Sequence, residues 1–116
     1  MKICFLDANE LSYTSRDINS KNLRGAENIL INLSHELIKL NQEITVYNNC
    51  TESGIINKIN WDNIKNIKKN NKFDIAITNN DIRLLNKINA IGTSVIKPGV
   101  NNKAKQTILE YNRNLL

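Results

Sequence analysis

The residues best suited to chemistry stand where a long polar stretch meets a helical pattern, at Arg24-Gly25-Ala26-Glu27. A glycine at a helix start leaves backbone N–H groups open to an incoming anion and lets a ligand approach closely. Arg24 beside it can pair bidentately with a phosphate group. The same glycine can equally serve only to let the chain enter the helix tightly. These residue types predict either an anion-binding helix N-terminus or a plain tight entry.

A second group with chemical potential consists of Asp7, which ends an apolar run, and Lys97-Pro98. A carboxylate cluster can hold Mg²⁺ while a lysine contacts a phosphoryl group. The pair resembles response-regulator receiver domains, and that resemblance implies a phosphate-accepting aspartate after a central strand, but here Ile77 is followed by Thr78-Asn79-Asn80. Asp81 comes too late in the chain and is typical of a helix cap.

Nucleophilic and metal chemistry find little support in the sequence. His35 is the only histidine, and we expect it to face solvent, opposite Leu33 and Leu37. A histidine without an orienting carboxylate is a poor base. No base partner is evident for the hydroxyl residues of the polar stretch, so a catalytic triad is not predicted for Ser12, Thr14, Ser15 or Ser20. Cys4 and Cys50 lack partners at metal-binding spacing, and we expect no metal and no cofactor.

Composition limits the classes of protein further. With 116 residues, 41% hydrophobic and 23% charged, the chain is expected to form one domain over residues 1–116. The net charge of +5 suggests an anionic partner, although the run Lys65–Lys72 is better interpreted as a solvated helix face. Aromatic residues make up 5% and are not interleaved with basic ones, so nucleic-acid binding is not expected.

The expected location is cytoplasmic. Two isolated thiols suit a reducing compartment, and neither a signal peptide nor an apolar stretch of membrane-spanning length is visible. Peripheral contact with the inner membrane surface stays open, because basic residues are attracted to anionic lipid.

The first half of the chain predicts strand, loop, helix and strand. An apolar run at Lys2–Asp7 is typical of a buried parallel strand, and Ala8–Leu23 is a long polar loop. Apolar residues at spacings of three and four predict a helix over Gly25–Leu40, with Glu27 in its first turn and a stop at Asn41. Glu43–Asn48 alternates and is rich in β-branched residues, which predicts a strand.

The second half repeats this order. A weaker edge strand is expected over Ile55–Ile59, and Trp61 is expected to staple the helix that follows it. That helix would be capped by Asp62 and carry Ile64 and Ile67 on one face. The remaining expected elements are a strand at Phe73–Thr78, a helix capped by Asp81 with Ile82, Leu85 and Ile88 inward, a strand at Thr93–Ile96 and a helix at Lys103–Leu115.

Alternating strands and helices predict an α/β fold, a Rossmann-like parallel sheet of about five strands with helices on both faces. Ligands of such sheets bind outside the carboxyl ends of the strands. The segments expected at that edge are 7–24, 48–51, 79–81 and 97–101.

The order of strand, long loop, Arg24-Gly25-Ala26-Glu27, amphipathic helix and Glu43-Ile44-Thr45-Val46-Tyr47 resembles the start of GT-B glycosyltransferases of the group-1, family-4 class. In that class a Gly-Gly-Ala-Glu or Gly-Gly-Ile-Glu element opens the first helix. The strand Phe73–Ile77 resembles the later strand that leads into the acceptor pocket. Two departures are that Arg24 replaces the first glycine, and that Asn79 and Asn80 stand where a histidine is often found.

The resemblance implies an acceptor-side domain of an enzyme that transfers a sugar from a nucleotide sugar to a glycan or lipid-linked acceptor. The implied substrate-binding residues are Arg24, Gly25, Ala26, Glu27, Asn79 and Asn80, and no catalytic residue is assigned. The donor-binding domain of that class does not fit within 116 residues, so we expect this chain to be truncated and inactive alone.

Two alternatives stay open. The segment Val95-Ile96-Lys97-Pro98 with Asp7 also resembles response-regulator receiver domains, although the long Ala8–Leu23 loop and the missing aspartate depart from that pattern. A third reading is a non-catalytic α/β binding module, which could dimerise through an exposed edge strand.

Overall fold

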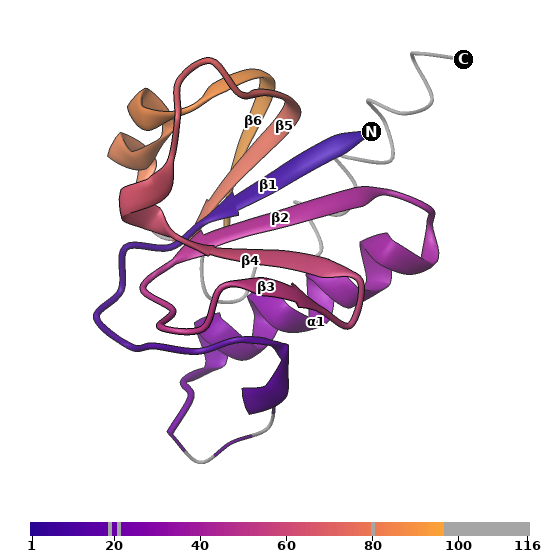
Figure 1. Cartoon of the computed structure of the whole chain (residues 1–116), viewed down its shortest axis with the longest axis vertical. Helices are drawn as coiled ribbons and strands as arrows, with labels where there is room; N and C mark the ends of the chain where they lie inside the picture. Colours follow the sequence, from indigo (N-terminus) through magenta and orange to yellow (C-terminus); the bar gives the residue numbers. More distant parts are fainter. Residues whose placement is uncertain (19, 21, 80, 97–116) are drawn as a thin grey trace.

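Five of the six strands in the described part of the chain form a parallel sheet, and a short sixth strand extends one edge (Figure 1). The computed structural model describes residues 1–18, 20, 22–79 and 81–96. The spatial order is β3-β4-β2-β1-β5-β6, with β3 antiparallel to β4. The strands are β1 (Lys2–Leu6), β2 (Glu43–Asn48), β3 (Gly54–Ile56), β4 (Ile59–Asn63), β5 (Lys72–Asn79) and β6 (Asn89–Ile96).

The parallel strands are arranged as in a Rossmann fold. In chain order they are β1, β2, β4, β5 and β6, so their spatial order is 3-2-1-4-5. The chain first moves outward from β1 through β2 to β4, and then returns to place β5 on the other side of β1. The predicted α/β, Rossmann-like class is therefore confirmed. The order reverses between β1 and β5, where such sheets open a crevice.

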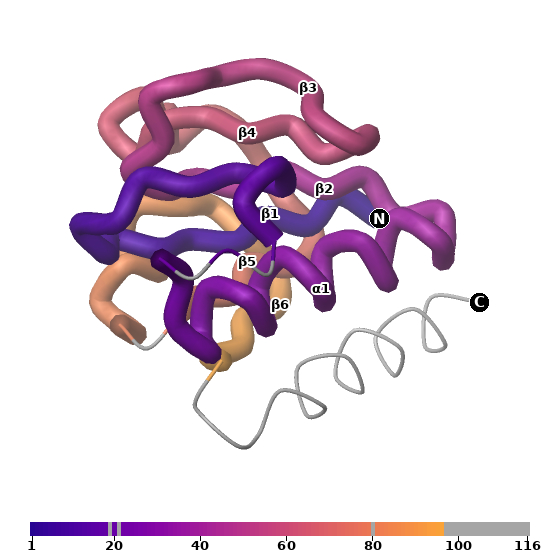
Figure 2. Tube along the Cα trace, turned by 90° about the horizontal axis from the view of Figure 1, so that it is seen from below, coloured from indigo at the N-terminus to yellow at the C-terminus, as the bar shows by residue number. Residues whose placement is uncertain are grey.

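One face of the sheet is covered by α1 (Gly25–Lys39), as Figure 2 shows. The predicted stripe is buried, with Leu30, Leu33 and Leu37 packing against the strands. Ser34 is also buried, and its hydroxyl donates to the Leu30 carbonyl at 2.8 Å. The helix ends at the predicted stop, because Asn41 adopts a left-handed conformation with φ of 62°.

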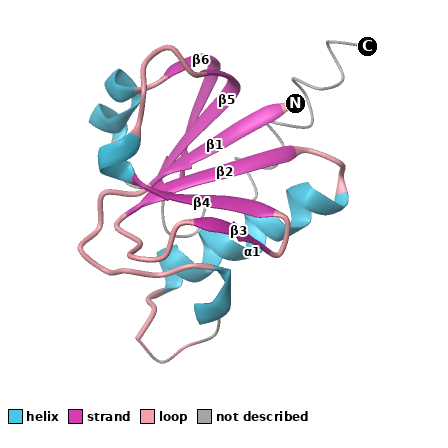
Figure 3. Ribbon diagram, in the orientation of Figure 1, coloured by secondary structure: helices cyan, strands magenta, loops and turns pink. Residues whose placement is uncertain are grey.

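The opposite face is covered by short 3-10 helices, η2 (Ile64–Asn66) and η3 (Ile82–Lys87). Leu84 and Ile88 pack there against the side chains of β1, β2 and β5 that alternate away from α1. Right-handed crossovers explain this arrangement, because connections that run in opposite directions from β1 reach opposite faces. Both faces thus carry helical elements, as the sequence predicts (Figure 3).

The prediction of a helix capped by Asp62 was wrong. β3 and β4 form a hairpin through Asn57 and Lys58, whose φ values of 51° and 68° suit a type I′ turn. β4 then continues to Asn63, whose side chain caps η2. The three-residue spacing of Ile64 and Ile67 fits one 3-10 turn followed by extended chain as well as it fits an α-helix.

Two side-chain placements also differ from expectation. Trp61 does not staple a helix but lies fully buried in β4, facing α1. In η3, Asp81 caps as predicted by accepting from the Arg83 N–H, but Ile82 is 64% exposed and Leu84 is buried instead. The last described strand begins at Asn89 and is longer than predicted, because β6 pairs along most of β5.

The long loop after β1 is held closely against the domain. It contains one 3-10 turn, η1 (Ser15–Asp17), which is capped by Thr14. Tyr13 is buried and packs edge-on against Trp61, and the Tyr13 carbonyl accepts from Asn48 Nδ2 at 2.8 Å. These contacts fix the positions of the two ends of the loop and of the polar residues located there.

Ser15 joins the loop to both α1 and β4. Its hydroxyl oxygen accepts from Trp61 Nε1 at 3.0 Å and lies 3.2 Å from His35 Nε2. His35 is therefore half-buried against Ser15 and does not simply face solvent, and Ser15 does have a base beside it, contrary to both predictions. Because Ser15 is only 2% exposed, this pair holds the loop in place and offers no accessible nucleophile.

Within the described ranges no helix is both long and apolar enough to span a bilayer. Lys97-Pro98 and the predicted helix at Lys103–Leu115 lie outside the described residues.

Replacing Ser15 with alanine should lower the free energy of unfolding by about 1–3 kcal/mol, because it leaves the buried Trp61 N–H without an acceptor. Chemical denaturation would measure the change. Ser20→Ala is the matched control, since the Ser20 hydroxyl accepts an exposed bond from the Asn22 N–H, and we expect a change within about 0.5 kcal/mol. Equal effects of the two substitutions would contradict the anchoring role of Ser15.

Acidification should destabilise the fold through His35. Burial, with a smaller contribution from Lys39, lowers the pKa of His35 in the folded state. The unfolded chain therefore binds more protons, so this stability is present above the unfolded pKa of about 6.5 and is lost as pH falls below it. The denaturation midpoint of the parent should decrease as the pH is lowered through this range. His35→Gln should make the midpoint depend less on pH. An unchanged slope in the variant would count against this assignment.

Candidate functional site

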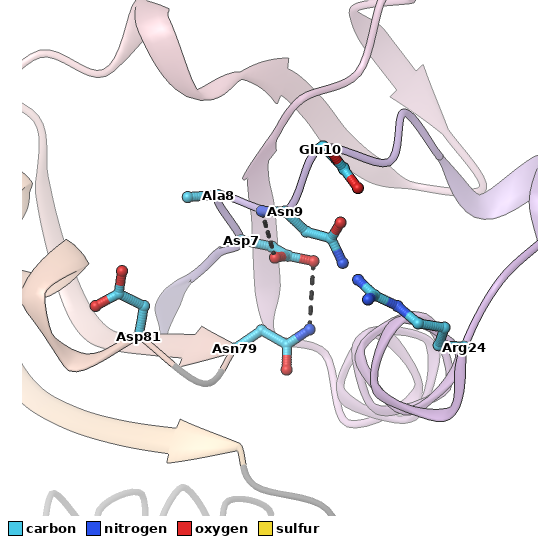
Figure 4. A pocket seen from close by; sticks show the side chains of 7 residues that line it. All are labelled: Asp7, Ala8, Asn9, Glu10, Arg24, Asn79 and Asp81. Atoms are coloured by element: carbon cyan, nitrogen blue, oxygen red, sulfur yellow. Dashed lines mark hydrogen bonds between the residues drawn. The ribbon is translucent and has the colours of Figure 1, made fainter.

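A polar pocket of about 410 Å³ opens where the strand order reverses, at the carboxyl ends of β1 and β5 (Figure 4). This is the position at which ligands bind to sheets of this kind. Three chain segments meet there: the turn after β1, the N-terminus of α1 and the end of β5. The lining residues are Asp7, Ala8, Asn9, Glu10, Arg24, Asn79 and Asp81.

Asp7 is the central side chain of the pocket and is only 3% exposed. Its Oδ1 accepts from the Asn9 N–H at 3.0 Å. Its Oδ2 accepts from the Tyr13 hydroxyl at 2.5 Å and from Asn79 Nδ2 at 3.3 Å. Burial, reinforced by the Asp7 charge, raises the pKa of Tyr13, so the Tyr13 hydroxyl keeps its proton and remains a donor to Asp7. Asp7 is thereby fixed in one orientation.

Asn79 brings the end of β5 to the same point. Its amide nitrogen points toward Asp7, while its oxygen is buried and finds no hydrogen-bond donor among the described residues (Figure 4). An unpaired buried acceptor costs about 1–3 kcal/mol, so a donor at this position would stabilise the protein. Sequence reasoning singled out Asn79, and the structure places it in the pocket.

Arg24 lines the pocket from the start of α1 and is oriented by Glu27. The Glu27 carboxylate, 1% exposed, accepts from the Arg24 N–H at 3.3 Å and from Arg24 Nε at 3.0 Å. This hydrogen bond is the main cause that raises the pKa of Arg24. Because Nε is the guanidinium nitrogen that donates to Glu27, the two terminal nitrogens of Arg24 remain for a ligand. Glu27 therefore holds Arg24 in place and does not line the pocket itself.

Gly25 and Ala26 form the first turn of α1 next to Arg24. The tight-entry interpretation of Gly25 finds no support, because its φ is not positive and a Cβ added there would meet no atom within 4 Å. The fold alone does not require a glycine at this place. Asn80, the last of the predicted binding residues, lies outside the described residues.

Of the four segments expected at the carboxyl edge, 7–24 and 79–81 meet at this pocket. The second, 48–51, is bonded to the chain's own loop, since Asn49 Nδ2 donates to the Glu10 carbonyl and the Thr51 N–H to the Ser12 hydroxyl. Segment 97–101 lies outside the described residues.

Three lining residues, Ala8, Asn9 and Glu10, fall in the expected segment 7–24 but were not singled out, because the loop has no periodic pattern. A usable signal was present in the Asp-x-Asn spacing. Asp7 and Asn9 each accept a bond from the N–H two residues later, which curls the chain back over β1.

The pocket presents more acceptors than donors. The Glu10 carboxylate has no ion-pair partner in the described part of the chain, and Asp81, the N-cap of η3, is paired with Arg83. Ligand hydroxyl groups suit these acceptors, whereas the guanidinium of Arg24 and the N-terminus of α1 suit an anionic group. Across residues 1–18, 20, 22–79 and 81–96, no cluster of His, Cys, Asp and Glu has the arrangement of a metal site.

The fold and the pocket define an α/β domain with Rossmann-like strand order and a polar site at its switch point. No family model, curated protein or solved structure matches the chain.

Gly25→Ala should raise the free energy of unfolding by about 0.4–1 kcal/mol, because alanine fits the helical backbone and reduces the entropy of the unfolded chain. Gly54→Ala is the matched comparison. Its φ of 142° strains any L side chain, although space is equally open, so we expect a loss of about 1–3 kcal/mol. Thermal or chemical denaturation would measure both, and destabilisation by Gly25→Ala would show that the helix entry does need glycine.

Proposed function

We propose that this chain is the acceptor-side domain of a GT-B glycosyltransferase of the group-1, family-4 type, and that the switch-point pocket binds a sugar-containing substrate. The observation that carries the proposal is the convergence of Asp7, Asn79 and Arg24 at the carboxyl ends of β1 and β5. Carboxylate and amide oxygens suit sugar hydroxyls, and an arginine beside a helix N-terminus suits a phosphate.

The roles follow from the geometry of each residue. Asp7 and Asn79 accept from or donate to hydroxyl groups of the sugar, and their mutual hydrogen bond fixes their spacing. Arg24, backed by Glu27, contacts an anionic part of a substrate near the first turn of α1, which Gly25 and Ala26 begin. None of these residues is assigned bond-breaking chemistry, which in that class depends on a second, donor-binding domain. The 116 residues alone bind sugar without transferring it.

Strand order argues against the receiver alternative. Receivers share the flavodoxin-like order 2-1-3-4-5, whereas the parallel strands here follow 3-2-1-4-5. The strand beside β1 ends in Thr78-Asn79, so it offers an amide where a phosphate-accepting carboxylate is needed. Acetyl phosphate with Mg²⁺ should leave the intact mass of the chain unchanged, and a gain of one phosphoryl group would restore that alternative.

Titration of the ¹⁵N-labelled chain with N-acetylglucosamine and methyl glucosides should shift the amide signals of the turn after β1, the start of α1 and the end of β5. Millimolar affinity suffices for detection, because free monosaccharides bind weakly when they bury little surface. Asn79→Ala should abolish the shifts, whereas Asn32→Ala, on the exposed face of α1, should retain them.

Shifts that are absent for every sugar, or that persist in Asn79→Ala, would overturn sugar binding at this pocket. A radiolabelled-sugar transfer assay tests the second half of the proposal, because turnover by these 116 residues would contradict their dependence on another domain.

A further inference from the structure

A second pocket, of about 610 Å³, lies at the same edge of the sheet but on the face opposite α1. Tyr47 and Asp62 are register partners on β2 and β4, and both alternate away from Val46 and Trp61, which face α1. This pocket shares no lining residue with the switch-point pocket. Its lining residues are Tyr47, Asp62, Lys65, Asn66, Ile67, Lys68 and Asn71.

The segment that carries the lysines of this pocket is fixed by the fold. Asn63 Oδ1 caps η2 by accepting from the Lys65 N–H at 3.0 Å, and the Asn71 N–H donates to the Lys68 carbonyl at 3.1 Å. Ile64 and Ile67 anchor the segment by packing against the cluster that contains Cys4, Leu6 and Tyr47. The backbone positions of Lys65 and Lys68 at the pocket rim are therefore set by buried contacts.

The pocket is lined by two lysines and one carboxylate, so its lining carries a net positive charge. Each described arginine is ion-paired, but Lys65 and Lys68 form no ion pair within the described residues. The single carboxylate of the pocket, Asp62, is occupied on Oδ1 by Ser53 Oγ, the Asn63 N–H and Asn66 Nδ2. Lys69 and Lys72 stand close by in sequence and add to the same field.

Tyr47 supplies a donor at the floor of the pocket. It is 4% exposed, and its ring packs edge-on against Phe73. Burial raises the pKa of Tyr47, so the hydroxyl keeps its proton. As a protonated phenol, Tyr47 can donate its proton to a ligand in the pocket that it lines.

We propose that this pocket binds a phosphate group, either of a free small molecule or of a lipid headgroup. Lys65 and Lys68 contact the phosphate oxygens from the rim, and the Tyr47 hydroxyl donates from below. Ammonium groups are common phosphate ligands, and the volume lies within the range of about 300–1,000 Å³ of small-molecule sites. The inference is independent of the proposed glycosyltransferase function, because it uses other residues on the other face.

Inorganic phosphate, titrated against the ¹⁵N-labelled chain at constant ionic strength with chloride as the balancing ion, should shift the amide signals of residues 65–71 and of Tyr47. The double substitution Lys65→Gln/Lys68→Gln should remove these shifts. Lys58→Gln/Lys87→Gln removes the same charge from exposed lysines elsewhere and should leave them in place. Equal losses in both double variants would show a mere net-charge effect and overturn the proposal.

The Tyr47→Phe substitution distinguishes specific phosphate binding in this pocket from nonspecific attraction of phosphate to a positively charged surface. It retains the ring contact with Phe73 and removes only the hydroxyl, so the fold should persist while phosphate binding weakens about tenfold, as expected for one hydrogen bond to a charged group. Unchanged phosphate affinity in a folded Tyr47→Phe variant would contradict the assigned donor.

Co-sedimentation with vesicles distinguishes the two sources of phosphate. The vesicles contain phosphatidylcholine and phosphatidylglycerol. If they bind the parent and the Lys58/Lys87 control but not the Lys65/Lys68 variant, this supports a headgroup as the ligand. Pocket shifts with free phosphate and no vesicle binding support a soluble ligand. If neither phosphate nor these vesicles bind in a way that depends on Lys65 and Lys68, the proposal fails.

Discussion

The buried carboxylate of Asp7 sets the arrangement of the carboxyl edge. A charge taken out of water at the end of a central strand must be compensated by donors. Three donors do so here, from the turn after β1, from Tyr13 in the long loop and from Asn79 on β5. The same contacts that solvate the charge therefore tie loop, β1 and β5 together at the switch point. A polar site in this position is a direct consequence of keeping one carboxylate inside.

The long loop then determines which part of the edge stays open. Tyr13 packs on Trp61, and Ser15 accepts from the Trp61 N–H, so the loop covers the ends of β2 and β4 on the α1 face. The switch-point pocket opens between β1 and β5. On the other face Tyr47 and Asp62 line the second pocket together with Lys65 and Lys68. The two pockets consequently differ in character: acceptors dominate beside α1, and donors dominate opposite it.

The sequence predicted the elements whose residues follow a single clear period. β1, α1, β2 and β5 were all located to within a residue or two, because Leu30, Leu33 and Leu37 mark one helix face and β-branched runs mark the strands. It was wrong between residues 57 and 66, where a hairpin without glycine in its turn and a 3-10 turn resemble a capped helix. Local spacing cannot separate these outcomes when pairing with β2 decides the matter.

For the candidate site, the sequence by itself determined that polar residues follow β1 and β5 and that Arg24 precedes α1. The ends of strands and the starts of helices can be predicted from the local pattern of apolar and polar residues. Only the tertiary structure decided that Asp7, Asn79 and Arg24 share one pocket. It also decided that Glu27 turns inward to hold Arg24, and that the Asn48 side chain is bonded to the loop. The physical reason is that these contacts join residues up to 72 positions apart, and their geometry follows from strand order and burial. The Arg24-Gly25-Ala26-Glu27 element, as sequence, indicated either an anion site or a tight helix entry; the fold adds that its glycine is sterically unconstrained and that its arginine pairs with the buried carboxylate of Glu27.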